Sequence, residues 1–256
     1  METKQEKIKF KFGLLGRDIS YSFSRGYFAE KFKVENLPHS YVNFDLQTID
    51  DLKSIIENTS NLKGVNVTIP YKEEVIPILD KLNKTAEKIG AVNTIKFSKK
   101  GKLVGYNTDY YGFKNSLKPH LKSHHKKALI LGTGGASKAI AYALKKLKIQ
   151  FDFVSRSHKK GVTFSYSDLT ENIISDYTII INCTPIGTFP NIEECPDLPY
   201  SGLSEHHILY DLIYNPEQTK FLNYGFKKGA TTINGLEMLR LQAEKSWEIW
   251  LDLKSK

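Results

Sequence analysis

Polar side chains that could bind a small acid stand close together near the start of the chain. Ser22 and Ser24 lie two residues apart in a segment expected to be extended, so their hydroxyls share one face. A helix is expected directly after them, and the amide groups of a helix N-terminus favour an anion. The pair could hold a carboxylate, or Ser24 could simply cap the helix. The pattern does not separate these two interpretations.

An amine, a carboxylate and an amide occur at three further points of the chain. Lys72 follows the run NVTIPY, Asp109 follows GYNT, and Asn93 lies inside GAVNT. Amines and carboxylates are groups that general acid–base chemistry uses. A Lys or Asp near a turn or helix start is nevertheless usually solvated, and Asn93 only interrupts an apolar run. Spacing alone therefore assigns no function to these three residues.

The glycine-rich stretch KALILGTGGASKAIAYALKKLK, residues 127–148, must position any nucleotide. Residues 128–131 are apolar, as in a strand buried on both faces, and apolar residues from Ile140 onward recur at helical spacing. Between them, Gly132, Gly134 and Gly135 would let the backbone approach a pyrophosphate at the helix N-terminus. Ser137 replaces the third glycine of the usual pattern. The alternative is a glycine turn that binds nothing.

The residues after the next strand, expected at 151–154, bear on which dinucleotide is bound. NAD enzymes place a carboxylate at the end of this strand. Here Ser155, Arg156 and Ser157 follow it, and a guanidinium with small hydroxyls suits a 2′-phosphate. The pattern therefore favours NADP over NAD. Asp152 lies inside the strand and is not expected to reach the ribose.

Composition limits the class of protein. The chain has 256 residues, enough for one large or two modest domains. No apolar run approaches the roughly 18 residues of a membrane helix, and the charged start lacks the apolar core of a secretion signal. Two cysteines make no disulfide framework and fit a cytoplasmic protein. The net charge of +9 comes from scattered lysines, so we expect anionic small ligands and no nucleic acid or membrane.

The periodicity predicts strands alternating with helices, which favours a largely parallel sheet. We expect strands at 8–15, 41–44, 64–68, 91–97 and 103–106, and a five-stranded wound sheet from 128–131, 151–154, 177–181, 208–213 and 230–233. Besides the helix after the glycines, we expect helices at 26–35, 49–57, 72–82 with a break at Pro77, and 236–251. The polar stretch 118–127 is the expected connection between domains. Within it, His124 and His125 are interpreted as surface histidines, not metal ligands, because no cysteine or carboxylate accompanies them.

Taken together, these residues resemble the shikimate dehydrogenase family, and the resemblance covers nearly the whole chain. It is specific because eight segments occur in the same order. They are Ser22-Phe23-Ser24, GVNVTIPYK ending at Lys72, GAVNT around Asn93, GYNTD ending at Asp109, Gly132-Thr133-Gly134-Gly135-Ala136, NCTPIG at 182–187, YDLIYNP at 210–216, and GLEML at 235–239 with Gln242.

The resemblance implies an α/β fold in which an N-terminal α/β substrate domain and a C-terminal Rossmann-like NADP-binding domain enclose a cleft. The substrate domain would comprise residues 1–110 joined by the C-terminal helix 236–256, and the NADP domain residues 111–235. Family members reduce 3-dehydroshikimate to shikimate with NADPH, on the route to aromatic amino acids. A monomer or a homodimer is expected.

The resemblance also implies a role for each matching residue. Lys72 would be the catalytic acid or base, assisted by Asp109. The implied substrate residues are Ser22 and Ser24 for the carboxylate, Thr68, Asn93, Asp109 and Gln242 for the ring hydroxyls, and Lys72 and Tyr214. The implied cofactor residues are Gly132, Thr133, Gly134, Gly135 and Ala136 for the pyrophosphate, Ser155, Arg156 and Ser157 for the 2′-phosphate, and Leu212 and Gly235 for the nicotinamide.

The chain departs from the family pattern at two places. Tyr21 and Arg25 stand where a His and a Pro usually flank the serines, and Ser155 and Ser157 replace the Asn and Thr beside the arginine. The second change replaces polar side chains with serine hydroxyls, which can still form hydrogen bonds, and it keeps the arginine. Three alternatives stay open: a quinate/shikimate dehydrogenase of mixed cofactor use, a catalytically dead NADP-binding regulatory module, and, from charge alone, a nucleic-acid binder.

Overall fold

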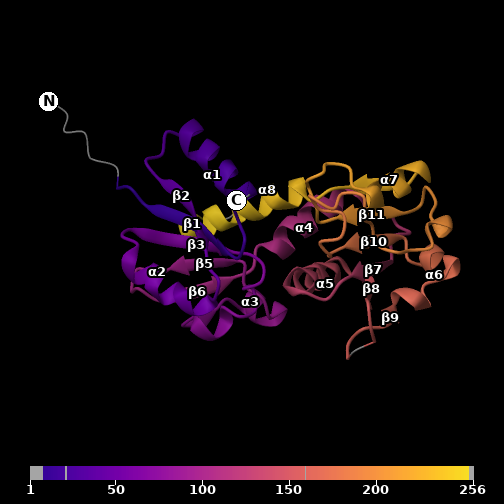
Figure 1. Cartoon of the computed structure of the whole chain (residues 1–256), viewed down its shortest axis with the longest axis horizontal. Coiled ribbons are helices and arrows are strands. Elements are labelled where there is room, and N and C mark those ends of the chain that lie inside the picture. The colour runs from indigo at the N-terminus through magenta and orange to yellow at the C-terminus, as the bar shows by residue number, and fades with distance from the viewer. Residues whose placement is uncertain (1–7, 21, 159, 254–256) are drawn as a thin grey trace. The chain divides into compact units, whose positions relative to one another are not determined.

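The computed structural model describes residues 8–20, 22–158 and 160–253 (Figure 1). The fold is α/β, and the chain forms two compact units. The first unit comprises Met1–Thr108 with Ala243–Lys256, and the second comprises Asp109–Gln242. The polar stretch 118–127 therefore lies inside the second unit, and the prediction that it connects two domains is wrong. Within the described residues, no helix combines the length and the apolar character needed to cross a bilayer.

The first unit contains a mixed six-stranded sheet, where a largely parallel one was expected. Its strands are β1 (Lys11–Gly16), β2 (Ser40–Asp45), β3 (Leu62–Val67), β4 (Lys81–Leu82), β5 (Thr94–Phe97) and β6 (Leu103–Tyr106), in the order β2-β1-β3-β5-β6-β4. Strands β1, β2 and β3 are parallel, whereas β5 is antiparallel to both β3 and β6. Only five residues join β5 to β6, and so short a connection permits only antiparallel pairing.

The helices of the first unit are α1 (Phe23–Val34), α2 (Leu52–Asn58), α3 (Lys84–Ile89) and the second half of α8 (Leu236–Trp250). The helix expected at 72–82 does not form. This segment is a series of turns with a 3₁₀ turn at Ile76–Ile78, followed by β4. Pro77 lies in that 3₁₀ turn, and its missing N–H and fixed φ prevent a continuous α-helix there. The short helix α3 was not predicted.

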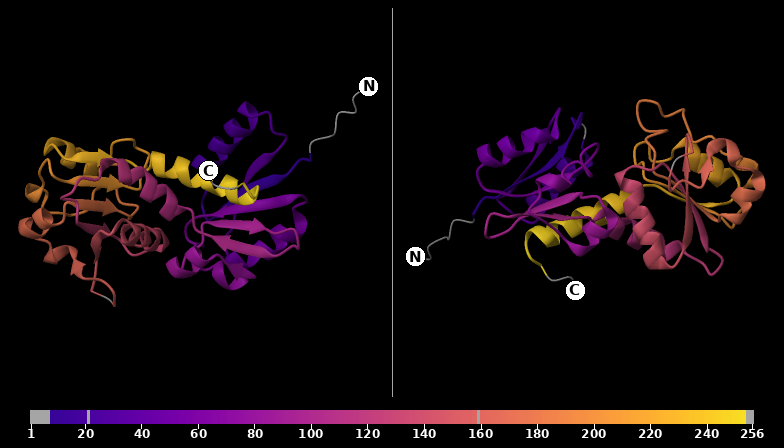
Figure 2. Two further views of the ribbon diagram at one scale, coloured as in Figure 1. Left: turned by 180° about the vertical axis from the view of Figure 1, so that it is seen from behind. Right: turned by 90° about the horizontal axis from the view of Figure 1, so that it is seen from below.

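The second unit is a parallel six-stranded sheet covered on both faces (Figure 2). Its strands are β7 (Lys127–Leu131), β8 (Gln150–Ser155), β9 (Phe164–Ser165), β10 (Ile179–Asn182), β11 (Ile208–Asp211) and β12 (Thr231–Ile233), in the order β12-β11-β10-β7-β8-β9. The two-residue strand β9 is additional to the five expected. The helices are α4 (Asp109–Leu117), α5 (Gly135–Leu147), α6 (Glu171–Asp176), α7 (Lys220–Lys227) and the first half of α8.

The apolar strands of the second unit separate two hydrophobic clusters. Ile130 lies in one cluster with residues of α4, α5 and α8, whereas Leu129 lies in the other with residues of α6 and α7. Helices on both faces explain why these strands read as continuous apolar runs. Helices α4, α6 and α7 were not predicted, because each is short and its pattern is weak in isolation.

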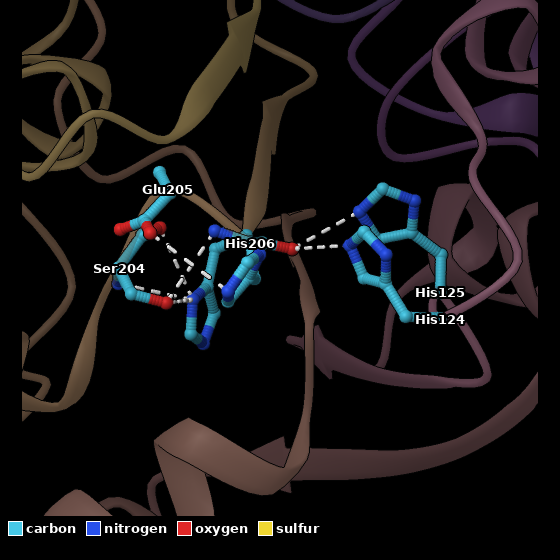
Figure 3. Close-up of polar contacts among 6 residues, drawn as sticks. His124, His125, Ser204, Glu205 and His206 are labelled. Carbon is cyan, nitrogen blue, oxygen red and sulfur yellow. Dashed lines mark hydrogen bonds and ion pairs between the residues drawn. The ribbon is translucent and has the colours of Figure 1, made fainter.

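His124 and His125, which were expected at the surface, both point toward the His206 carbonyl oxygen (Figure 3), but they differ in their burial. His124 is exposed, but His125 is only 5% exposed, and the prediction is wrong for it. The Nδ1 atom of His125 accepts a hydrogen bond from the Lys122 amide at 2.8 Å, and the Nε2 atoms of both histidines lie 3.1 Å from the carbonyl oxygen of His206. Burial lowers the pKa of His125. Among the described residues, no group of three or more His, Cys, Asp or Glu side chains could hold a metal ion.

Candidate active and cofactor sites

The serine pair lies at the start of helix α1. Ser22 is the N-cap residue, and its side-chain oxygen accepts a hydrogen bond from the Arg25 amide at 3.3 Å. The capping role that the sequence offered to Ser24 therefore belongs to Ser22. A hydroxyl that accepts from an amide still has its own hydrogen to donate, so capping and anion binding are compatible. Ser24, inside the first turn, is 8% exposed. Tyr21 lies outside the described residues.

Lys72 lies on a turn whose backbone is held on both sides. The Thr68 amide donates to the Leu15 carbonyl at 2.8 Å, which joins the start of the turn to β1. Tyr71 is fully buried, and its hydroxyl donates to the Leu46 carbonyl at 2.6 Å. The carbonyl of Lys72 itself accepts from the Val92 amide at 2.7 Å. The local backbone is therefore fixed before any ligand binds.

Asn93 lies beside this turn, with 2% of its surface exposed. Its Oδ1 atom accepts from the Thr108 amide at 2.7 Å, and its Nδ2 atom donates to Thr108 Oγ1 at 2.9 Å. The backbone donor shows that the oxygen of the side-chain amide faces Thr108 N. The orientation of the Asn93 side chain is thus determined by its neighbour.

Five of the predicted site residues gather at one edge of the first sheet. Ser22 and Ser24 follow β1, and Thr68 and Lys72 follow its parallel neighbour β3. Asn93 immediately precedes β5, which is antiparallel to β3, so the start of β5 meets the carboxyl end of β3. Residues from separate parts of the sequence therefore form one polar edge where ligands of such sheets bind.

Asp109 and Gln242 belong to the second unit, where α4 and α8 approach closely. Asp109 is the first residue of α4 and is 5% exposed. Gly112 follows one turn later, and a Cβ atom there would lie 2.4 Å from the Met238 carbonyl oxygen and 3.2 Å from the Gln242 Cβ atom. The two helices therefore touch backbone to backbone, which places the buried Gln242 beside the first turn of α4.

The glycine turn has the features of an anion site. Gly132 follows β7 with φ of +98°, a conformation that favours glycine. Gly134 is the N-cap of α5 and provides no side chain to accept from the first-turn amides. Thr133, Gly135 and Ala136 complete the turn and the helix start. Amide groups without a capping side chain are suited to a phosphate, so these residues fit a pyrophosphate.

Ser155, Arg156 and Ser157 stand beside the glycine turn, because the Gly132 amide donates to the Val154 carbonyl at 2.9 Å. Arg156 and Ser157 are exposed beyond the end of β8. Asp152 faces elsewhere: one carboxylate oxygen accepts from Thr163 Oγ1 at 2.5 Å and the other from the Tyr177 hydroxyl at 2.6 Å. Both oxygens of Asp152 serve the structure, as its place inside the strand suggested.

Leu212 and Gly235 are in contact. A Cβ atom at position 235 would lie 2.1 Å from the Leu212 carbonyl oxygen, so any larger residue would displace the backbone after β11. Tyr214, two residues after Leu212, is partly buried. These three residues lie at the carboxyl end of the parallel sheet, where dinucleotides bind in such folds.

The sequence analysis assigned no role to Asp211, a fully buried carboxylate at the end of β11. Asp211 accepts from Thr219 Oγ1 at 2.6 Å, from Asn182 Nδ2 at 3.1 Å and from the Ile213 amide at 3.1 Å. Burial raises its pKa to about 6, although these three hydrogen bonds lower it. Asp211 therefore joins the ends of β10 and β11 next to Leu212. In the sequence, Asp211 could have been noticed because it is a charged residue at the end of an apolar run.

Comparison with known proteins gives a consistent result. Residues 14–95 match the family model described as the shikimate dehydrogenase substrate binding domain. A curated protein from Methanosphaera stadtmanae, named shikimate dehydrogenase (NADP(+)), is 40% identical over 93% of this chain and 90% of its own length.

Solved structures agree with the sequence comparison. A crystal structure of a shikimate dehydrogenase in complex with NADP⁺ has a TM-score of 0.85 and 35% identity, over 97% of this chain and 92% of its own. Shikimate 5-dehydrogenase from Thermus thermophilus, solved in complex with NADP(H) and shikimate, has a TM-score of 0.84 and 28% identity, over 96% and 95% of the two chains.

Proposed function

Because this chain belongs to the shikimate dehydrogenase family, we propose that it catalyses the reversible NADP-dependent reduction of 3-dehydroshikimate to shikimate. The observation that supports the proposal is the polar edge of the first sheet, where Ser22, Ser24, Thr68 and Lys72 follow β1 and β3, and Asn93 precedes β5. Two hydroxyls suit a carboxylate, an amide and a further hydroxyl suit ring hydroxyls, and an amine suits a carbonyl oxygen that must gain a proton.

We propose that residues 1–110 with 236–256 form the substrate domain and that residues 111–235 form the NADP-binding domain. These bounds differ by a few residues from those of the two compact units. The family-model match at residues 14–95 supports the first assignment, and the glycine turn supports the second. Asp109, Tyr214 and Gln242 are the further residues that we propose as substrate ligands.

The proposed chemistry divides between cofactor and protein. NADPH, when bound, supplies the hydride that reduces the carbonyl carbon. Lys72 supplies the proton that the carbonyl oxygen gains, and in the reverse direction its neutral amine takes that proton from the hydroxyl. Asp109 orients the ammonium group and one ring hydroxyl. The fixed backbone on both sides of Lys72 would limit the region that the amine can reach.

The residues of the second unit fit the cofactor. First-turn amides of α5 would bind the pyrophosphate around Gly132–Ala136, and Arg156 with Ser155 and Ser157 would bind the 2′-phosphate. Asp152, the one carboxylate within β8, is hydrogen-bonded to Thr163 and Tyr177 and so is not offered to a 2′-hydroxyl. Leu212 and Gly235 would flank the nicotinamide.

The deciding experiment measures initial rates with shikimate and with quinate, each with NADP⁺ and with NAD⁺. We expect the highest kcat/KM for shikimate with NADP⁺. Comparable rates with quinate, or with NAD⁺, would instead indicate a quinate/shikimate dehydrogenase of mixed cofactor use. NADP⁺ binding without turnover of either acid would indicate a regulatory module.

A further inference from the structure

A network of hydrogen-bonded, buried polar side chains runs through the apolar interior of the first unit, beneath the polar edge. Its members are Tyr41 on β2, Asn66 on β3, Thr94 on β5, Asn93, Thr108, and Ser246 on α8. All are between 0% and 7% exposed. Buried polar groups are costly unless hydrogen-bonded, and apolar residues of similar size would fit such positions at no such cost. Packing alone therefore does not explain why polar residues occupy the positions of this network.

Ser246 lies at the centre of this network of side chains. Its Oγ atom accepts from Asn66 Nδ2 at 2.9 Å and lies 2.8 Å from Thr94 Oγ1 and 3.2 Å from Thr108 Oγ1. Three segments far apart in the sequence thus meet at one hydroxyl contributed by the C-terminal helix. Ser246 is fully buried, and it stands one helical turn after Gln242 on the same face of α8.

One end of this network is Asn93, which is proposed to bind a ring hydroxyl. Thr94 Oγ1 donates to Asn93 Oδ1 at 3.0 Å, and that oxygen also accepts from the Thr108 amide. Ser246 therefore contacts both residues that orient the Asn93 side chain.

The other end of this network is the Tyr41 hydroxyl on β2, which donates to Asn66 Oδ1 at 2.9 Å. Asn66 lies between the apolar Val65 and Val67, whose side chains point to the opposite face of the sheet. A continuous set of hydrogen bonds thus links Tyr41 to Asn93.

We infer that Ser246 is a positioning residue of the substrate site, acting through Thr94 and Thr108 to hold Asn93 in the geometry that binds the ring acid. The inference rests on the proposed function. Fully satisfied buried networks rigidify the groups they connect, and a site gains affinity when its side chains are ordered before the ligand arrives.

The test compares Ser246→Ala and Thr94→Val with wild type in steady-state shikimate oxidation. Each change removes one hydroxyl, and valine keeps the shape of threonine. We expect the KM for shikimate to rise about fivefold or more, and the KM for NADP⁺ to stay within about twofold. Thr94→Ser retains the hydroxyl and should restore the wild-type KM for shikimate.

Ser116→Ala is the matched control. Ser116 is 5% exposed in the second unit, and its hydroxyl lies 2.7 Å from the Tyr210 hydroxyl. Neither residue belongs to the network described above. This variant should lose similar thermal stability with both KM values unchanged. An unchanged KM for shikimate in folded Ser246→Ala or Thr94→Val would overturn the inference, as would an equal rise in Ser116→Ala. The wild-type rate tests the proposed function separately, because it does not depend on any variant.

Discussion

At the scale of single residues, Lys72 lies on a turn whose backbone is held by its neighbours. The buried Tyr71 anchors the turn to Leu46, and the Val92 amide binds the Lys72 carbonyl. The backbone position of Lys72 thus depends on Tyr71 and Val92, neither of which is proposed to bind the substrate.

Replacing Lys72 tests its proposed role directly. Lys72→Met keeps the length of the side chain and removes the proton, so kcat for shikimate oxidation should fall about 10²–10⁴-fold, with a small change in KM. Lys53→Met is the control, because the Lys53 side chain is 82% exposed on α2. A Lys72→Met enzyme with kcat close to wild type would remove Lys72 from the mechanism.

At the scale of elements, helix α8 contributes to both units. Residues up to Gln242 belong to the second unit, and those from Ala243 belong to the first. In the first unit, Trp250 is fully buried, stacks on Phe12 with ring centroids 4.9 Å apart, and donates from Nε1 to the Ile95 carbonyl at 3.0 Å. A Cβ atom on Gly64 would lie 2.2 Å from this indole, so only glycine leaves room for it.

Removing this anchor should cost the first unit much of its stability. Trp250→Ala leaves a large cavity and removes the hydrogen bond to the Ile95 carbonyl, and we expect the free energy of unfolding to fall by about 3–5 kcal/mol. Urea titration measures the loss. Leu253→Ala, at a side chain 53% exposed near the same terminus, should change it by less than about 0.5 kcal/mol. Equal midpoints for the two variants would contradict the anchoring role of Trp250.

At the scale of the whole molecule, the net charge of +9 favours anionic ligands such as a carboxylate and a dinucleotide. The carboxylate of one buried residue, Asp211, destabilises the folded state when it is charged. Asp211 is fully buried, and burial raises its pKa from 3.8 to about 6. The folded protein therefore binds more protons than the unfolded chain between these two values.

This difference predicts a pH dependence of stability. The contribution from protonated Asp211 is fully present below about pH 4 and is lost as the pH rises through about 6. The shift corresponds to about 3 kcal/mol. Asp211→Asn cannot titrate, so wild type should lose about 3 kcal/mol relative to this variant between about pH 4 and about pH 7. Urea titrations across this range measure the difference, and parallel curves for the two proteins would show that Asp211 titrates normally.

The sequence by itself determined the features that depend on neighbouring residues. The glycine turn, the Ser155–Ser157 loop and most strands are local patterns of three to fifteen residues, and each was found where it was expected. The ordered series of short segments was enough to indicate the family. The helix expected at 72–82 was wrong because Pro77 and the pairing of β4 with β6 outweigh apolar spacing.

Only the tertiary structure decided which polar residues lie at the same edge of a sheet. No local pattern distinguished Lys72 and Asn93 from solvated residues. They join the serines because β1, β3 and β5 lie side by side in the sheet. Asp211 and Ser246 stand out for a related reason, since burial and hydrogen bonds to distant strands give them their character. Such contacts arise from packing between segments far apart in the chain, and the order of residues along it does not display them.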